Sequence, residues 1–384
     1  MRDWLGVVKM KDNRIIRILQ IGMSPYYGGT ESFLMSQYRA IDRTKIQFDF
    51  LNVYNEKIAC QDEIESLGGH IYYLDMARHH GMKTYYKNLD LFFSENAKKF
   101  DAVHCNFQSL INIDILKYAK KYKIKVRIAH AHNAGYGTKP SKKQKLIIAF
   151  NRMIVKKYAT HYFACSSLAA KWMFGKSATL IKNAIDVEKY LYSEATREEV
   201  RKQMGFENQF VIIFVGRLDP QKNPIFLLEI FSEIKKIKKD AKLLVVGDGI
   251  LKNKMIEKIK ELGIMDSVNM LGSRKDVNRL LQASDVFLLP SKFEGLGIVL
   301  IEAQVAGLPT FTTKDVVPEE AKITNLLTFI PKGNSAMYWA EEICKYRIDK
   351  RSDTKNIVRS SGYDNTENAV KLLKIYQKII GGCK

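Results

Sequence analysis

The chain has 384 residues, of which 46% are hydrophobic and 27% charged. This composition fits a folded globular protein and excludes disordered, collagen-like and coiled-coil classes, and the length predicts two or three domains. Lysine and arginine total 62 against 41 aspartate and glutamate residues, a formal net charge of +21. An anionic partner is therefore expected, whether nucleic acid, lipid headgroups or a phosphorylated substrate.

The cysteines and the first residues indicate where the protein works. The cysteines are odd in number and lack the close spacing of zinc or redox motifs, so they are predicted to be reduced thiols. The opening MRDWLGVVKMKDNR carries charges where a signal peptide needs an apolar run, and no run of eighteen apolar residues occurs. We expect a cytoplasmic chain that does not span a membrane. The cysteines are Cys60, Cys105, Cys165, Cys344 and Cys383.

The first half of the chain alternates short apolar runs with helix-like sequence. Residues 14–22, RIIRILQIG, predict a strand that runs into the glycine loop SPYYGGTE and then an amphipathic helix from residue 32. Such alternation predicts a parallel sheet covered on both faces. Further strands are expected in FDFLNVY, HIYYLD, DAVHCN, KVRIAHAHN and HYFACS.

A second series of strands begins after residue 190. Its members are FVIIFVGRLD, KLLVVGDG, SVNMLGS, DVFLLPS and LPTFTT, and their spacing predicts a second doubly wound α/β domain. We place the first domain at residues 1–186 and the second at 187–363. The segment 364–384 reads as an amphipathic helix that joins the first domain.

The densest chemistry lies in SKFEGLGIVLIEAQVAGLPT, residues 291–310. The pattern predicts a strand, a loop of Glu294, Gly295, Leu296 and Gly297, and a helix over 298–305 that carries Glu302. Glycines at a helix N-terminus let backbone N–H groups approach a phosphate. The two glutamates are eight residues apart and would accept hydrogen bonds from two different sugars. The alternative is a helix cap at Glu294 and a solvated Glu302.

Three further loops follow predicted strands of the second half. GRLDPQKNP places Arg217 and Lys222 at the carboxyl end of a strand, where ligands of parallel sheets bind and where two cations can neutralise a diphosphate. The alternative is that both cations are simply solvated. The other two loops hold Gly247, Asp248, Gly249 and Gly272, Ser273, Arg274.

Together these motifs resemble the retaining glycosyltransferases of family 4, and the likeness covers nearly the whole chain. It implies the GT-B fold: two facing Rossmann-like doubly wound domains with a deep cleft between them. It also implies that Arg217 and Lys222 bind the donor diphosphate, that Glu294 orients the donor sugar, and that Glu302 binds the ribose. The amides of Gly295, Leu296 and Gly297 would complete the phosphate cradle. Gly249 with Gly272, Ser273 and Arg274 would border the base.

In the first half, GGTE places Gly28 and Gly29 before a helix, and the resemblance implies that this loop faces the donor. A plain strand-to-helix turn is the alternative; the G-x-G-x-x-G spacing of dehydrogenases is absent. His130 and His132 alternate at a strand end and share one face. The resemblance places His132 beside the donor sugar and His130 behind it. The alternative is that both histidines have only a structural role. No neighbouring residue in the sequence completes a metal site with them.

A 71-residue window, 115–185, contains sixteen lysines and arginines and no acidic residue. Within it, residues 139–158 pair a basic set with apolar residues at helical spacing. Such a helix could lie on an anionic leaflet; a core-packing helix with a solvated basic face is the alternative. The basic set is Lys142, Lys143, Lys145, Arg152, Lys156 and Lys157.

The predicted function is retaining, metal-independent transfer of a hexose from a nucleotide-diphosphate sugar, UDP foremost, to a lipid-linked or oligosaccharide acceptor. The resemblance points to bacterial capsule or exopolysaccharide synthesis, with no cofactor besides the donor, no nucleic acid, and a peripheral place at the inner face of the plasma membrane. The oligomeric state is open. The alternatives are a basic nucleic-acid-binding α/β protein and a sugar-nucleotide epimerase of the same fold.

Overall fold

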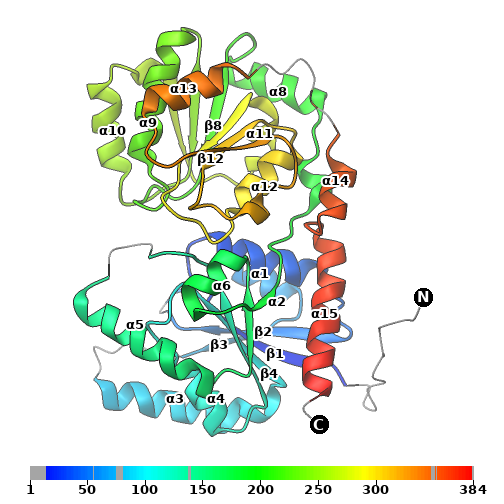
Figure 1. The fold of residues 1–384 in the computed structure, drawn as a ribbon. Helices are drawn as coiled ribbons and strands as arrows, with labels where there is room; N and C mark the ends of the chain where they lie inside the picture. Colours follow the sequence, from blue (N-terminus) through cyan, green and yellow to red (C-terminus); the bar gives the residue numbers. More distant parts are fainter. Residues whose placement is uncertain are drawn as a thin grey trace. The chain divides into compact units, whose positions relative to one another are not determined.

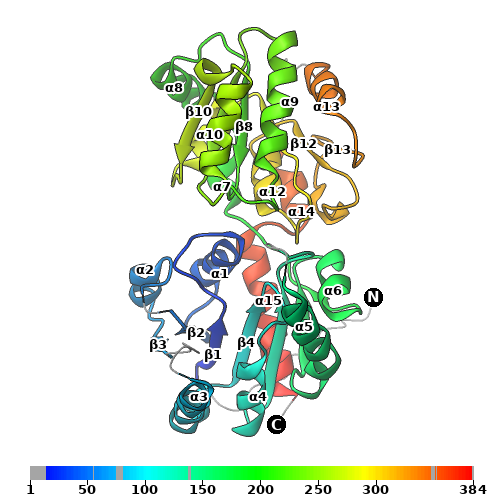
Figure 2. The ribbon, with the colours of Figure 1, turned by 90° about the vertical axis from the view of Figure 1, so that its left-hand side faces the viewer.

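The structure is a computed structural model that describes residues 14–54, 56–74, 81–136, 140–346, 351 and 353–382. By the contacts among its residues the chain divides into two compact units. The first is Met1–Asn133, Pro140–Ala184 and Asn365–Lys384; the second is Ala134–Lys139 and Ile185–Asp364. Each unit is an α/β layered structure of its own (Figures 1 and 2).

The first unit is built on a seven-stranded sheet in the order β3-β2-β1-β4-β5-β6-β7, and every pairing in it is parallel. Buried apolar and β-branched residues along β1, β2 and β4 explain why these segments form inner strands covered on both faces. The strands are β1 (Ile16–Ile21), β2 (Ile46–Asn52), β3 (Ile71–Tyr73), β4 (Ala102–Phe107), β5 (Val126–Ala131), β6 (His161–Ala164) and β7 (Thr179–Leu180).

The helices of the first unit connect these strands. Strand order runs outward from β1 to β3 and then returns to β4, so right-handed crossovers place the later helices on the opposite face from the earlier ones. The order reverses between β1 and β4, which makes this the switch point of the sheet. The helices are α1 (Gly29–Ala40), α2 (Gln61–Ser66), α3 (Met82–Asn96), α4 (Asp114–Lys121), α5 (Lys142–Ile154) and α6 (Ser167–Phe174), with 3-10 turns η2 (Ala97–Lys99) and η3 (Val155–Lys157).

The last helix of the chain, α15 (Asn365–Gly381), belongs to the first unit and packs on α1 (Figure 1). Its buried face includes Leu372 and Tyr376, which join the core formed by α1, β1 and β2. Asn368 donates a hydrogen bond to the carbonyl oxygen of Lys182. After the second unit the chain therefore returns to the first unit through α15.

The second unit has a six-stranded parallel sheet in the order β10-β9-β8-β11-β12-β13, with its switch point between β8 and β11. The strands are β8 (Val211–Val215), β9 (Lys242–Val246), β10 (Val268–Gly272), β11 (Val286–Leu289), β12 (Thr310–Thr313) and β13 (Leu327–Ile330).

The helices of the second unit precede, connect and follow its strands along the chain. Among them α9 packs against α10 and α13, and α8 packs against α11. The helices are α7 (Val187–Tyr190), α8 (Glu194–Met204), α9 (Pro224–Ile237), α10 (Lys252–Glu261), α11 (Val277–Ala283), α12 (Ile298–Val305), α13 (Ala336–Cys344) and α14 (Lys355–Ser360), with 3-10 turns η4 (Met265–Ser267) and η5 (Glu319–Ala321).

The predicted fold class is confirmed: both sheets are parallel and doubly wound. The expected boundaries at 186/187 and 363/364 compare with unit boundaries at 184/185 and 364/365, and the segment 134–139 groups with the second unit. Among the described residues, no helix combines the length and the apolarity that crossing a bilayer requires. The expectation about a signal peptide concerns residues 1–13, which lie outside the described part of the chain.

Candidate functional site

The two strands at the switch point of the second sheet are followed by the two loops that hold most of the predicted site residues. β8 runs into residues 216–223 and β11 into residues 290–297, so both loops leave the carboxyl edge of the sheet side by side. Lys292 N–H donates to the Gln221 carbonyl oxygen at 2.8 Å, and the Gln221 side-chain amide donates to Phe293 O at 3.3 Å. These bonds tie the two loops into one surface, at the place where α/β sheets bind ligands.

Lys222 and Glu294 meet at this edge. Lys222 Nζ lies 2.6 Å from Glu294 Oε1, with the two side chains 14% and 4% exposed. The hydroxyl of Ser291, itself buried, donates to the same Glu294 oxygen at 2.6 Å. A largely desolvated ion pair persists when further hydrogen bonds satisfy it. Lys222 is therefore not the freely solvated side chain of the alternative interpretation.

Arg217 lies in the same loop as Lys222, but its side chain is more exposed to solvent. Its side chain is 58% exposed, and its guanidinium reaches Asp219 at 3.2 Å and Gln221 Oε1 at 3.3 Å. The Asp219 carboxylate also accepts from Lys222 N–H at 3.0 Å, which shapes the turn. Arg217 therefore presents a cation to solvent beside the buried Lys222 and Glu294 pair.

The glycine loops of β8, β9 and β10 are joined by backbone hydrogen bonds. Leu218 N–H donates to Asp248 O at 2.9 Å, and Gly247 N–H to Gly272 O at 2.8 Å. A Cβ on Gly249 would stand 2.6 Å from Leu218 O, closer than any real side chain allows. Gly249 is thus required by the close approach of its neighbour.

Arg274 and Ser273 extend this edge beyond β10. The Arg274 guanidinium pairs with Asp276 through two bonds of 2.8 and 2.7 Å and stays partly exposed. Gly272, before them, adopts a φ of +64° with nothing within 4 Å of a Cβ, so backbone conformation rather than space requires glycine there.

α12 begins where the sequence predicts, with Gly297 at its N-cap in a left-handed conformation of φ +78°. The Leu296 side chain is buried and anchors the loop. Gly295, Leu296 and Gly297 thus lie at the positive end of the helix dipole, and a phosphate is stabilised at such an end.

Glu302 projects from α12 and is buried, and its carboxylate Oε1 accepts a 3.0 Å hydrogen bond from the Tyr190 hydroxyl of α7. Burial raises the pKa of Glu302 from 4.5 to about 7, opposed by this hydrogen bond and by Lys189. The alternative of a solvated helix glutamate is therefore wrong, since Glu302 is 8% exposed.

In the first unit the GGTE loop is closed by a glutamate. The buried Glu31 carboxylate accepts from the N–H groups of Ser24 and Gly28 at 2.9 and 3.0 Å and from the Ser24 hydroxyl at 2.8 Å. Gly28 is the N-cap of α1, and Gly29 has open space where a Cβ would stand. The loop that leaves β1 at the switch point is therefore held in one shape.

His130 and His132 lie together at the end of β5, with ring centroids 4.0 Å apart. His132 Nε2 lies 2.8 Å from Asn106 Oδ1 at the end of β4, and His130 is completely buried. Burial lowers the pKa of His132 to about 3 and that of His130 well below its usual value. Both imidazoles are neutral at physiological pH.

The described residues contain no group of three or more His, Cys, Asp or Glu side chains arranged to hold a metal ion. Cys60, Cys105, Cys165 and Cys344, the cysteines in the described part of the chain, form no disulfide there.

The basic helix predicted within 139–158 is α5 (Lys142–Ile154), followed by η3. Leu146, Phe150 and Met153, spaced four and three residues apart, are 73%, 55% and 63% exposed and share one face of the helix. Ile148 faces inward and is buried. The alternative, in which the apolar residues all pack into the core, is therefore wrong for this stripe.

The basic residues of α5 and η3 are exposed, but one of them has another role. Arg152 donates to the carbonyl oxygens of Met173 and Trp172 at the end of α6. Its guanidinium binds a helix C-terminus although the residue is exposed, so the basic residues that we assign to a surface are Lys142, Lys143, Lys145, Lys156 and Lys157.

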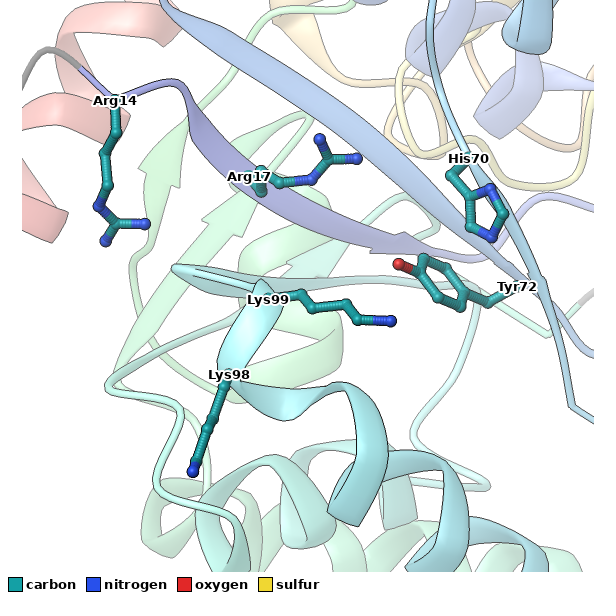
Figure 3. Close-up of a pocket in the computed structure, with 6 residues that line it drawn as sticks. All are labelled: Arg14, Arg17, His70, Tyr72, Lys98 and Lys99. Carbon is teal, nitrogen blue, oxygen red and sulfur yellow. The ribbon is translucent and has the colours of Figure 1, made fainter.

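A hollow of about 640 Å³ lies in the first unit at the amino ends of β1 and β3 (Figure 3). Arg17 makes two bonds to the buried Asp49, and Lys99 donates to Asn96 with its Nζ 5.6 Å from the Tyr72 ring. These cations have internal partners, and none of the predicted site residues lines the hollow. Its lining is Arg14, Arg17, His70, Tyr72, Lys98 and Lys99.

Comparisons with known proteins identify the class of protein to which this site belongs. Residues 196–361 match the family described as Glycosyl transferases group 1. EpsF of Bacillus subtilis (strain 168), to which glycosyltransferase activity is assigned provisionally, is 30% identical over 370 residues, 94% of this chain and 96% of that protein. The chain belongs to the group 1 glycosyltransferases, and it is a glycosyltransferase.

Two further matches extend this result. An Escherichia coli protein named UDP-Gal:alpha-D-GlcNAc-diphosphoundecaprenol alpha-1,3-galactosyltransferase is 25% identical over 305 residues, 77% of this chain and 78% of that protein. The crystal structure of Anabaena Alr3699/HepE in complex with UDP-glucose matches with a TM-score of 0.70 and 18% identity, covering 96% of this chain and 99% of the other. The fold is the GT-B fold of glycosyltransferases.

Several residues of these sites were not predicted from the sequence. Ser291 holds Glu294, Tyr190 holds Glu302, and Asn106 holds His132. Ser291 is the first residue of the motif at 291–310, so its contact with Glu294, three residues later, could have been predicted from the sequence. Tyr190 lies 112 residues from Glu302, and Asn106 lies 26 residues from His132 on the neighbouring strand, so neither belongs to the local sequence of the residue that it holds.

Proposed function

We propose that this glycosyltransferase transfers a hexose from a UDP-sugar, with retention of anomeric configuration, to a lipid-linked or oligosaccharide acceptor in cell-surface polysaccharide synthesis. The observation that carries the proposal is the ion pair of Lys222 with Glu294 at the switch point of the second sheet, where the loop that holds Arg217 and Lys222 is hydrogen-bonded to the loop of Glu294. Cationic side chains and a carboxylate thus lie on the same pair of loops.

The chemistry proposed for this surface is electrostatic. Arg217, Lys222 and the amides at the start of α12 stabilise the negative charge that develops on the leaving diphosphate. In this proposal Glu294 accepts hydrogen bonds from hydroxyls of the donor sugar, and Glu302 accepts them from hydroxyls of the ribose. Gly249 and the segment from Gly272 to Arg274 border the base. The leaving diphosphate takes the acceptor proton on the same face, and no metal is required.

In the first unit, we assign His132 and the loop of Gly28 and Gly29 to the donor sugar. Glu31 fixes the loop by three hydrogen bonds, and Asn106 fixes the imidazole. A fixed polar surface costs less ordering entropy when substrate binds.

The names of the relatives support the choice of donor and acceptor. The E. coli relative is named for UDP-Gal and a diphosphoundecaprenol acceptor, and HepE was crystallised with UDP-glucose. A relative from Campylobacter jejuni, 36% identical over 107 residues, is named for an undecaprenol-diphosphate-linked glycan. On these grounds we propose a UDP-sugar and a polyprenyl-diphosphate-linked glycan.

An acceptor anchored in lipid calls for contact with a bilayer. We propose that α5 rests on the anionic inner face of the plasma membrane, with Leu146, Phe150 and Met153 among the acyl chains and the flanking lysines at the headgroups. The enzyme would then work in the cytoplasm as a peripheral membrane protein.

The donor site is tested by thermal shift of the purified protein with UDP, GDP, ADP and TDP, without added metal. A ligand that binds only the folded protein raises its melting temperature. We expect UDP to stabilise the wild type and to lose at least half of its shift in Arg217→Ala, because the exposed guanidinium contacts the diphosphate in the proposal. The control is Arg279→Ala, which removes a guanidinium paired with Glu199 on the surface of the same unit.

Two results would contradict the proposal. One is an equal UDP shift in wild type and Arg217→Ala, which removes Arg217 from the donor site. The other is no shift with any nucleotide, which removes the nucleotide-sugar donor. A rise in melting temperature with GDP, ADP or TDP in place of UDP would change only the proposed base of the donor.

A further inference from the structure

A buried polar network lies in the first unit under the carboxyl ends of β1, β4 and β5, and α15 closes it. Every member is 9% exposed or less. Buried polar groups are nearly always hydrogen-bonded, so the position of each proton can be deduced from its neighbours. The members are Gln20, His104, Asn106, His130, His132 and Tyr376.

The orientation of Asn106 is fixed by a backbone carbonyl. Its Nδ2 lies 3.0 Å from Ile21 O, which only accepts hydrogen bonds, so this atom must be the amide nitrogen. The same nitrogen donates to Gln20 Oε1 at 3.1 Å. Asn106 Oδ1 therefore faces His132 Nε2 as an acceptor, at 2.8 Å. His132 carries its proton on Nε2 and a lone pair on Nδ1.

The other branch follows from the same anchor. Because Gln20 accepts through Oε1, its Nε2 is the donor to Tyr376 Oη, at 3.3 Å. The Tyr376 hydroxyl then directs its own proton to His104 Nδ1, at 2.6 Å. His104 in turn donates from Nε2 to His130 Nδ1, at 3.0 Å. His130 is left with its proton on Nε2.

The two branches end in complementary atoms. His130 Nε2 and His132 Nδ1 are buried, and neither has a hydrogen-bond partner among the described residues. Their rings are adjacent, with centroids 4.0 Å apart. One nitrogen is a donor and the other an acceptor, and a hydroxyl can satisfy both because it accepts and donates at once.

We propose that His130 and His132 form a hydroxyl-binding site, in which His130 Nε2–H donates to a hydroxyl oxygen and His132 Nδ1 accepts its proton. The hydroxyl comes from an ordered water or from the donor sugar, and only the second source rests on the proposed function. Asn106 and Tyr376 are positioning residues, since each acts by fixing the tautomer of a histidine.

The electrostatics agree with this assignment. Burial lowers the pKa of His104 to about 3, as it does for His132, and it lowers the pKa of His130 well below its usual value. Each ring is therefore neutral and offers one donor and one acceptor. The ring of Phe33 packs against both end histidines, with centroids 5.1 and 5.0 Å away, and helps to keep the site apolar around the hydroxyl.

The test is NMR of the intact protein labelled with 15N-histidine, in which long-range 1H–15N correlations report each tautomer without any turnover. We expect the Nε2–H tautomer for His104, His130 and His132. A His132 Nδ1 resonance that moves to its hydrogen-bonded position with UDP-glucose or UDP-galactose, and not with UDP, assigns the hydroxyl to the sugar. A resonance at that position in the free protein, unchanged by either sugar nucleotide, assigns it to water.

The proposal is overturned by an Nδ1–H tautomer at His130 or His132, or by a His132 Nδ1 that stays unbonded in every state. Tyr376→Phe tests the relay: His104 and His130 should each become a mixture of tautomers, while His132, held by Asn106, keeps one. Tyr363→Phe is the control, because this buried tyrosine donates to Glu320 O in the second unit. Unchanged tautomers in Tyr376→Phe would also overturn the relay.

Discussion

At the scale of single residues, the buried carboxyl of Glu302 gives the sharpest dependence on pH. Its pKa is about 7 in the folded protein and 4.5 ordinarily, so the folded state holds the proton more tightly. The free energy of unfolding therefore falls as the pH rises from about 4.5 to about 7 and is level above that. A shift of this size corresponds to about 3 kcal/mol.

Glu302→Gln removes this titration while its amide oxygen still accepts from Tyr190. Between pH 5 and pH 8 the wild type should lose up to about 3 kcal/mol more unfolding free energy than the variant, measured by urea denaturation at both values. Glu257→Gln, an exposed glutamate of α10, is the control and should follow the wild type. Parallel behaviour of wild type and Glu302→Gln would show that Glu302 is not buried as described.

How far the sequence predicts the candidate site differs from residue to residue. The glycines around Glu294 and the run GRLDPQKN predicted that both loops lie at ligand-binding ends of strands. The ion pair of Lys222 with Glu294 was not predicted, because the order of the strands in the sheet decides which loops meet. Tyr376 could not be predicted as a partner of His104, since 272 residues separate them. Contacts between distant elements depend on packing, which no local pattern encodes.

At the scale of elements, α5 is the helix of the first unit that we propose binds a membrane surface. Its exposed stripe makes a direct prediction: the protein should sediment with vesicles that contain phosphatidylglycerol, more weakly as salt rises, and should not sediment with pure phosphatidylcholine. Phe150→Glu should reduce the bound fraction about tenfold or more, because burial of a phenylalanine contributes about 1.5–3 kcal/mol.

The matched control is Val370→Glu on α15, a residue that is 50% exposed on another helix of the same unit. It adds the same charge without touching α5. Equal losses in the two variants, or equal sedimentation with both kinds of vesicle, would argue against a membrane role for α5.

Elements were predicted well where their own pattern is strong. The helix expected at 298–305 has these bounds, because glycine and proline limit it on both sides. The strands β7 and β13 were missed. β7 is two exposed residues at the edge of its sheet, and β13 is an edge strand of four residues, so both runs are short. Edge strands need their neighbours to form, so their local sequence says little.

At the scale of the whole molecule, two parallel sheets each present their loops at a switch point, and the chain returns to the first unit through α15. The alternation of strands with helices predicted this architecture, since βαβ connections allow few others. The assignment of residues 134–139 to the second unit was not predicted, because it depends on contacts rather than on any break in composition.

The central claim, sugar transfer that depends on the loops of the second sheet, is tested by offering radiolabelled UDP-glucose, UDP-galactose and UDP-N-acetylglucosamine with synthetic undecaprenyl-diphosphate-linked sugars. We predict label from one donor in the lipid fraction, with the anomeric configuration of the donor retained. Arg217→Ala should slow incorporation about 100-fold, a typical effect of removing one electrostatic stabiliser, whereas Arg279→Ala should not. Incorporation at the wild-type rate in Arg217→Ala, or no incorporation from any UDP-sugar, would contradict the claim.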